Sequence, residues 1–445
     1  MKGVRCMLGT TRKARKGMAV WLIALLLVAA GCGGNQADNR SGTNGGNQTS
    51  GGTSSGTSGG GQTEKVTIEF FNMKADVVDL FDQYIADFHA KQSNITVEQN
   101  NVPTPENVWQ MRVSTGDAPE VFTHYPHNAV FQQMSKEGRV VDLTGDPLLA
   151  NVNPAIVELS QIDGKNYLVP IALATLGVYY NVDIFNELGL DIPQTYDEFL
   201  AAAQKIRDAG ITPFYFHDKD WNGIRQEVVF KMGLQIPGVE EFLDQVMNGQ
   251  AHITDNPDFR PFAQRLLDLR QYGQQDALGT SYDDALREFA NGNAAMWFTG
   301  IWAIKTIRDS NPDLNFSMFP LPAEKAEDTR LQISVDTAIG MPADGKHPEA
   351  ARTFIEFMSS QETVQKYIDA AGYPSAIQGI ANNNDKIERL NDIITAGKVY
   401  PTIERVWPPG VNSDVGKATQ EMFASGDIDA YLQKLDAIFF DKYNK

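Results

Sequence analysis

Two pairs of adjacent acids come closest, among all residues of this chain, to the requirements of a hydrolytic enzyme. A glycoside hydrolase needs two carboxyl groups on either side of one bond, with the pKa of one of them raised. The pairs Asp283 with Asp284 and Glu240 with Glu241 fall in stretches that we expect to be helical and solvated. Neither pair lies on a loop with a partner acid, so the sequence predicts a protein that is not an enzyme.

Histidines and tyrosines form two weak metal-binding patterns. His124 and His127 could be metal ligands, but no carboxylate or third histidine accompanies them, and a loop histidine can equally cap a backbone group. Tyr179 and Tyr180 could bind ferric iron, yet they fall in an expected strand, where neighbouring side chains point to opposite faces. The chain contains no phosphate-binding loop or dinucleotide fingerprint. We therefore expect no metal and no cofactor.

The elements that must position a binding site begin with a predicted strand, helix and strand. Residues 65–71 alternate and then become apolar, residues 77–91 have the period of an amphipathic helix, and residues 95–99 form the next strand. Such a unit implies parallel strands. Asn72 and Lys74 follow the first strand, and residues just past the carboxyl end of a strand lie at the ligand crevice of an open α/β sheet.

A second unit of the same kind is predicted in the middle of the chain. Residues 167–172 and 176–181 are expected to be buried strands, and the step between them is a candidate hinge. Thr195 and Glu198 form a capping box that begins a helix, Gly210 ends this helix, and another strand follows. We expect the strands on either side of the helix to be parallel, and the chain to belong to the α/β class.

The N-terminal region has the pattern of an exported and anchored protein. Residues 1–17 carry six basic residues and no acid, and residues 18–30 are an apolar run too short to span a bilayer. Residues 1–31 are therefore predicted to be a signal peptide. The Ala-Ala-Gly-Cys sequence ending at Cys32 looks like a lipobox, in which Cys32 would be lipidated; ordinary secretory cleavage is the alternative. Residues 32–63 are mostly Gly, Ser, Thr and Asn, which predicts a flexible tether.

Charge and size limit the possible binding partners and the number of domains. The first 31 residues contain six of the 38 basic residues and none of the 56 acids, so the mature chain has 32 against 56 and a formal charge of −24. Nucleic acids and anionic lipid surfaces would repel such a protein. Cys32 is the only cysteine of the mature chain, which excludes an internal disulfide. At about 150 residues per domain, the globular region suggests two or three domains, and two lobes fit.

Several linked motifs resemble a known family. The motif DGK-x-Y-x-x-P occupies residues 163–170, YYN-x-D-x-F residues 179–185, and GL-x-x-P-x-T-x-x-E residues 189–198. In this order they are similar to the hinge and second-lobe motifs of the maltose-binding-protein-like branch (family 1) of the extracellular solute-binding proteins, which are lipoproteins of carbohydrate ABC transporters. Residues 292–302 resemble a further motif of this family that ends in G-x-W.

The resemblance implies a two-lobe, type II periplasmic-binding-protein-like fold of the α/β class, in which several chain crossings form the hinge. Residues 64–173 together with 334–380 would form the N-terminal lobe. Residues 177–331 together with 384–445 would form the C-terminal lobe.

The resemblance also implies where ligand is bound. In the family, the loop after the third strand and the glycine and tryptophan of the last motif contact sugar, and another aromatic contact lies near Trp407. Asp220 and Trp221 belong to a polar loop, whose indole could stack on a ring or anchor the loop. Maltose binders carry an acid at the position of Ala174, beside Thr175, so the ligand is not expected to be simply maltose. The candidates are Asn72, Lys74, His124, Tyr125, His127, Asn128, Thr175, Asp220, Trp221, Gly300, Trp302, Asp336, Trp407 and Asn412.

A sugar would suit these residue types, because a pyranose has an apolar C–H face and a rim of hydroxyls. An aromatic ring can bury the face, whereas leaving a buried hydroxyl unpaired costs roughly 1–3 kcal/mol. The resemblance implies a monomeric lipoprotein on the outer face of a membrane, Gram-positive by analogy with the long tether. It would capture a sugar or oligosaccharide between its lobes and deliver it to an ABC permease. An exported glycoside hydrolase and a receptor for a non-sugar solute are the alternatives.

Overall fold

Two β-sheets organise the computed structural model, which describes residues 65–441. The first sheet has the order β10-β9-β3-β1-β2, with β4 also paired to β9, and the second has the order β6-β7-β5-β8. The strands of the first sheet are β1 (Val66–Phe71), β2 (Ile95–Asn100), β3 (Val121–His124), β4 (Val169–Ala174), β9 (Leu331–Gly340) and β10 (Val399–Pro401). Those of the second are β5 (Leu176–Asn181), β6 (Thr212–Phe214), β7 (Ala294–Gly300) and β8 (Phe316–Phe319). The predicted signal peptide, lipobox and tether lie outside the described residues.

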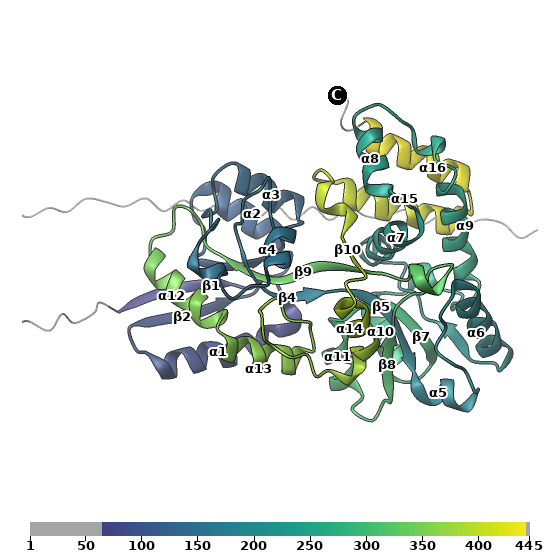
Figure 1. Ribbon diagram of the computed structural model, residues 1–445, viewed down its shortest axis with the longest axis horizontal. Helices are drawn as coiled ribbons and strands as arrows, with labels where there is room; N and C mark the ends of the chain where they lie inside the picture. The colour runs from purple at the N-terminus through teal and green to yellow at the C-terminus, as the bar shows by residue number, and fades with distance from the viewer. Residues whose placement is uncertain (1–64, 442–445) are drawn as a thin grey trace, which may run out of the picture. The chain divides into compact units, whose positions relative to one another are not determined.

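Helices cover both sheets (Figure 1). Those that follow the strands of the first sheet are α1 (Val78–Lys91), α2 (Pro105–Thr115), α3 (Ala129–Lys136), α4 (Pro154–Leu159), α12 (Pro348–Met358) and α13 (Gln361–Ala371). The others are α5 (Val182–Glu187), α6 (Tyr196–Asp208), α7 (Trp221–Gln235), α8 (Val239–Met247), α9 (Phe259–Arg270), α10 (Tyr282–Ala290), α11 (Ala303–Ser310), α14 (Glu388–Thr395), α15 (Val411–Ser425) and α16 (Ile428–Asp436). Within residues 65–441, no helix is both long and apolar enough to cross a membrane.

The first sheet is a layer between two groups of helices, as the alternation of β1 requires. Phe70 packs edge-on against Phe81 of α1 and Phe354 of α12, with ring centroids 5.3 and 5.4 Å apart. Its neighbour Glu69 points to the opposite face, where it forms a bidentate pair with Arg112 of α2. The predicted parallel pairing of β1 with β2 is confirmed, with Val66 opposite Ile95.

The second predicted parallel unit is wrong, although its strands and its helix α6 exist. Strand β7, from much later in the chain, lies between β5 and β6. It pairs parallel to β6 but antiparallel to β5, so β5 and β6 run in opposite directions and do not touch. The α/β class holds, because helices connect and cover both sheets.

Two strands link the sheets to each other. After β4 the chain passes through Thr175 directly into β5, so the first sheet continues into the second. Strand β9 returns in the opposite direction and pairs with β4 along most of its length. The predicted strand at 332–341 is therefore confirmed, and it carries Asp336 between the two sheets.

A second hydrophobic core lies among helices. Residues of α7, α8, α9, α15 and α16 pack together, with Phe259, Leu243 and Trp407 fully or almost fully buried. This core is distinct from the one that covers the sheets. It supports α7, whose first residue is Trp221.

The cap of α6 gives a test of the local prediction. The Thr195 hydroxyl accepts from the Glu198 backbone N–H at 3.3 Å, while the Glu198 carboxylate accepts from the Gln194 N–H, one residue before the expected partner. Thr195→Ala should lower the free energy of unfolding by about 1 kcal/mol, because a donor of the first helical turn loses its acceptor. Urea denaturation would measure this. Thr195→Ser should cost much less, and equal losses from both variants would contradict the capping role.

Candidate ligand-binding site

A buried ion pair joins the loop after β1 to β9. The Lys74 ammonium lies 2.6 Å from a carboxylate oxygen of Asp336 and 3.8 Å from one of Asp76. Burial opposes the charge of Lys74, but the carboxylates outweigh it and raise its pKa well above the ordinary value. The Tyr373 hydroxyl donates to Asp76 at 2.8 Å, and the Lys74 ammonium lies over the Tyr373 ring. Asp76 is more exposed than its partners, so its carboxylate can accept further hydrogen bonds from a ligand.

Asn72 shapes this loop from within. Its side chain accepts from the Lys74 N–H and donates to the Lys74 carbonyl, both at 2.8 Å. It also donates to the Gln99 side chain at 2.9 Å and is fully buried. Asn72 thus positions Lys74, and its amide group has little capacity left for a ligand.

The loop after β3 contributes residues with different surroundings. His124 is buried between Trp109 and Phe131, and its Nδ1 accepts from the Tyr125 N–H at 2.9 Å. It is the last residue of β3 and a core residue, so its packing argues against a ligand contact. Tyr125 follows it within electrostatic range of Lys74, Asp336 and Asp76, and burial raises the pKa of Tyr125 to about 12.

His127 and Asn128 complete this loop. The His127 Nε2 lies 4.0 Å from the Glu404 carboxylate, and burial lowers the pKa of His127 although Glu404 opposes this effect. Asn128 caps α3 by accepting from the Phe131 N–H and donates to Glu106 at 3.0 Å. His127 therefore remains the better candidate of the two for a ligand contact.

The tryptophan of the Gly-x-Trp motif lies against its own glycine. A Cβ added to Gly300 would meet the Trp302 ring at 1.9 Å, so only glycine allows the indole to lie where it does. The Gly300 carbonyl accepts from the Tyr179 hydroxyl at 2.8 Å, and the Thr175 carbonyl accepts from the Ile301 N–H at 3.1 Å. These bonds fix Trp302, which is half-buried, beside the link between β4 and β5.

Tyr282, at the start of α10, connects the two sides of the site. Burial raises the pKa of Tyr282, and the negative charge of Asp76 raises it further, whereas the side chains of Trp302 and Thr299 lower it. Tyr282 is therefore close to Trp302 on one side and within electrostatic range of Asp76 on the other. Its backbone N–H donates to Asp220 at 2.8 Å, and this hydrogen bond holds the loop before α7 next to Tyr282.

A buried network of four charges holds the loop that carries Asp220 and Trp221. Arg270 of α9 donates to both oxygens of Asp218 at 2.8 and 2.9 Å and to both oxygens of Glu227 at 2.7 and 2.8 Å. Lys231 completes the network at Glu227. Burial alone would raise the pKa of Glu227, but the two cations lower it well below its ordinary value.

Trp221 and the last two candidates have contrasting environments. Trp221 is 37% exposed and therefore free to contact a ligand. Trp407 is 3% exposed and packs edge-on against Phe439 at 5.0 Å, so its packing argues for a core role. Asn412 is half-buried in the first turn of α15, and its Oδ1 has no hydrogen-bond partner among residues 65–441.

Several residues of this site were not among the predicted ones. They lie two residues past Lys74, in the Gly-Tyr-Pro motif after α13, near the beginning of α7 and of α10, and in the segment after β10. Those near the beginning of an α-helix share a signal, a polar residue at the N-terminus of a helix, whereas Tyr373 and Glu404 do not. The residues concerned are Asp76, His217, Arg225, Tyr282, Tyr373 and Glu404.

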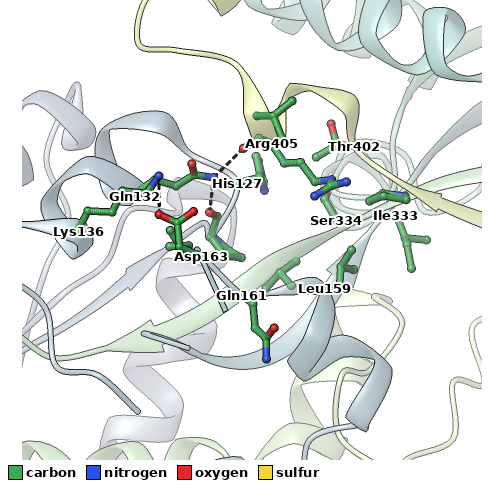
Figure 2. Close-up of a pocket in the computed structure, with 15 residues that line it drawn as sticks. His127, Gln132, Lys136, Leu159, Gln161, Asp163, Ile333, Ser334, Thr402 and Arg405 are labelled. Atoms are coloured by element: carbon green, nitrogen blue, oxygen red, sulfur yellow. Dashed lines mark hydrogen bonds and ion pairs between the residues drawn. The ribbon is translucent and has the colours of Figure 1, made fainter. Parts of the chain in front are cut away.

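A cavity of about 250 Å3 lies beside the site, between α3, β9 and the segment after β10 (Figure 2). Of the predicted contacts, only His127 lines it, whereas Lys74 and Trp302 do not. Among residues 65–441, no group of three His, Cys, Asp or Glu side chains could hold a metal ion. The described residues thus gather acids, hydroxyls and an indole, which is a set suited to hydrogen bonding and stacking.

Strands β4 and β9 join two β-sheets that are covered by helices. Polar and aromatic groups from both sheets lie near this junction. This arrangement defines a two-domain, type II solute-binding protein. The family model for bacterial extracellular solute-binding proteins matches residues 74–365. The chain therefore belongs to this family of binding proteins.

Individual relatives agree with this assignment. The multiple sugar-binding protein of Streptococcus mutans serotype c is 29% identical over 382 residues, which is 84% of this chain and 90% of the relative. The melibiose/raffinose/stachyose-binding protein MelE of Bacillus subtilis is 25% identical over 363 residues, covering 78% and 82%. The structure of RafE in complex with raffinose has a TM-score of 0.77 and 28% identity, covering 85% of this chain and all of the other.

Removing Arg270 should destabilise the protein strongly. Arg270→Met leaves the buried Asp218 and Glu227 without their bidentate partner, and we expect a loss of about 3–5 kcal/mol in the free energy of unfolding. Arg260→Met, on the same helix, removes an exposed pair with Asp429 and should cost less than about 1 kcal/mol. Equal losses in chemical denaturation would contradict the importance of the buried network.

His124 should make stability fall as the solution is acidified. Burial lowers the pKa of His124 to about 3, while in the unfolded chain it returns to its ordinary value. Below that ordinary value the unfolded state binds a proton that the folded state does not, so stability is lost as pH falls. Between about pH 7.5 and 5.5 this single group should cost about 1.4 kcal/mol.

The variant His124→Gln should remove that part of the pH dependence in urea titrations. His252→Gln is the matched control, because the His252 ring is exposed and Asp436 raises its pKa. If His124→Gln leaves the acid-side slope as steep as in the unaltered protein, the assignment of that slope to His124 is wrong.

Proposed function

We propose that this protein captures a neutral sugar or oligosaccharide between two lobes and delivers it to the permease of an ABC transporter. The observation that carries the proposal is the juxtaposition of the Lys74, Asp76 and Asp336 cluster with Tyr282 and Trp302. Carboxylates and hydroxyls can pair the rim of a sugar, and the indole can cover its apolar face. MelE is named for binding melibiose, raffinose and stachyose, and RafE was solved in complex with raffinose, which supports an oligosaccharide.

Closure of the two lobes is the proposed mechanism. Residues 64–173 with 334–380 would move against residues 177–331 with 384–445, with β4, β9 and the segment near Asn382 as hinge. The Ala376 N–H donates to the Ile171 carbonyl, and the Ser317 hydroxyl donates to the Lys386 carbonyl, which supports a boundary between positions 376 and 386. Ligand that contacts both lobes would favour the closed form by its higher affinity for that form.

The proposal includes an anchored, extracellular location. Cleavage before Cys32 and its lipidation, palmitate included, would leave the binding domains on a Gly/Ser/Thr/Asn tether outside the cell membrane. Such an anchor suits a Gram-positive surface, and the protein would act as a monomer that meets the permease subunits. Globomycin treatment should then accumulate the uncleaved precursor.

We further propose that binding occurs without catalysis. Asp284 caps α10 through Ser281, and Glu240 pairs with Arg405, so both acid pairs contain a residue with a structural partner. The site acids at Asp76 and Asp336 are engaged with Lys74 and Tyr373, which favours hydrogen bonding to ligand over proton transfer. A glycoside hydrolase and a receptor for another solute remain the alternatives that the ligand screen addresses.

Trp302→Ala tests the sugar site. Loss of the indole should weaken oligosaccharide binding by about 1–3 kcal/mol in calorimetry, while thermal unfolding changes little, because the ring is only half-buried. Trp407→Phe is the matched control, since Trp407 lies in the helical core and should affect stability and not affinity. Unchanged affinity of Trp302→Ala would refute the assignment.

A thermal-shift screen of the mature protein against mono- and oligosaccharides identifies the ligand, since bound ligand stabilises the folded state by mass action. Raffinose, stachyose and melibiose should be included because relatives carry these names. Chromatography of the same mixtures would detect hydrolysis. Failure of every sugar to stabilise the protein would favour a receptor for another solute.

A further inference from the structure

We infer that the cavity between α3, β9 and residues 401–406 is a second binding site, for one neutral ring-shaped polyol or monosaccharide. It goes beyond the proposed oligosaccharide site, because Lys74, Asp336, Tyr282 and Trp302 do not line it. We call it the β9 cavity. Its walls come from four separate parts of the chain, namely α3 with the loop before it, the end of α4 with the turn after it, β9, and the segment at the end of β10 and after it (Figure 2).

The size of the β9 cavity points to a small ligand. Its volume of about 250 Å3 is well above the ~30 Å3 that one water occupies in the liquid. It is also just below the roughly 300–1,000 Å3 of sites for drug-sized ligands. A single six-membered ring with its hydroxyl groups fits between these limits.

The lining combines an apolar wall with polar groups. Leu159, Ile162, Ile333 and Val335 supply aliphatic surface, which can cover the C–H face of a ring. Gln132, Gln161, Ser334 and Thr402 supply amides and hydroxyls that can pair with ring hydroxyls. This combination suits an amphipathic ring better than a purely apolar molecule.

The charges at the β9 cavity favour a neutral ligand. Lys136 pairs with Asp163 at 3.1 Å, and Arg405 pairs with Glu240, so both cations already have partners. Gln132 donates to the Arg405 carbonyl at 2.8 Å, which joins α3 to the segment after β10 (Figure 2). An anion would find no uncommitted cation among these lining residues.

Three buried polar atoms of residues that line the β9 cavity have no hydrogen-bond partner in the described part of the chain. They are Nδ1 of His127, Oγ1 of Thr402 and Nε of Arg405. Leaving such a group unpaired costs a free energy comparable to that of a lost hydrogen bond, and unpaired buried groups are therefore uncommon. Hydroxyls of a bound ring can satisfy all three, because a hydroxyl both donates and accepts.

Amide chemical shifts of Ser334 and Val335 report on this cavity directly, and the probes are myo-inositol and D-glucose. At least one should shift these amides with millimolar affinity. Gln161→Trp should fill the mouth of the cavity and weaken binding about tenfold, whereas Gln83→Trp, at an exposed position of α1, should not. Arg405→Lys keeps the charge opposite Glu240 but loses Nε, and should weaken binding more than Arg260→Lys does.

Trp302→Ala separates this inference from the proposed function. It should weaken oligosaccharide binding but leave ring binding at Ser334 and Val335 within about twofold. If neither ring shifts these amides, or if Gln161→Trp binds as well as the Gln83→Trp control, water fills the cavity and the inference is overturned. If rings bind there but no oligosaccharide binds anywhere, the proposed function is wrong, and the inference that the β9 cavity binds a ring-shaped ligand is upheld.

Discussion

The pairing of β9 is the constraint on which the arrangement of the site depends. Buried backbone N–H and C=O groups must be hydrogen-bonded, so a strand that runs through the interior needs neighbours along its length. On one side β9 has β4, and on the other it has β10 at Leu331 to Ile333 and β3 at Ala338 to Gly340. Residues 334–337 lie between these two partners and have a strand neighbour on one side only.

That interruption is where the binding features gather. In this stretch Asp336 pairs with Lys74, and the Thr337 hydroxyl donates to Asp336 at 2.8 Å and lies 2.9 Å from the Tyr367 hydroxyl of α13. Ser334 and Val335 line the β9 cavity at the same interruption. The Lys74–Asp336 ion pair and the β9 cavity thus lie at the stretch where β9 changes partner.

Much of the first sheet could be predicted because its signals are local. The amphipathic period of α1 and the alternation of β1 and β2 are sufficient for a parallel pair. The order of the second sheet could not be predicted, since the strand between β5 and β6 comes from residues 294–300. The position of His124 could not be predicted either. Strand β3 ends at His124, one residue later than its apolar pattern does, and the His124 ring therefore lies in the core.

The tryptophans show why burial, and not residue type, decides a binding role. Trp109, Trp297 and Trp407 are at most 3% exposed and fill cores, and the aromatic partner of Trp407, Phe439, is distant in sequence. Trp302 differs because Gly300 removes the side chain that would otherwise displace the indole. One face of that indole is covered by its own backbone, so any ligand that stacks must use the other face. In the proposed function, selectivity among sugars would come from Asp76, Tyr282 and their neighbours, since an indole covers the apolar face of any pyranose alike while an unpaired hydroxyl is costly.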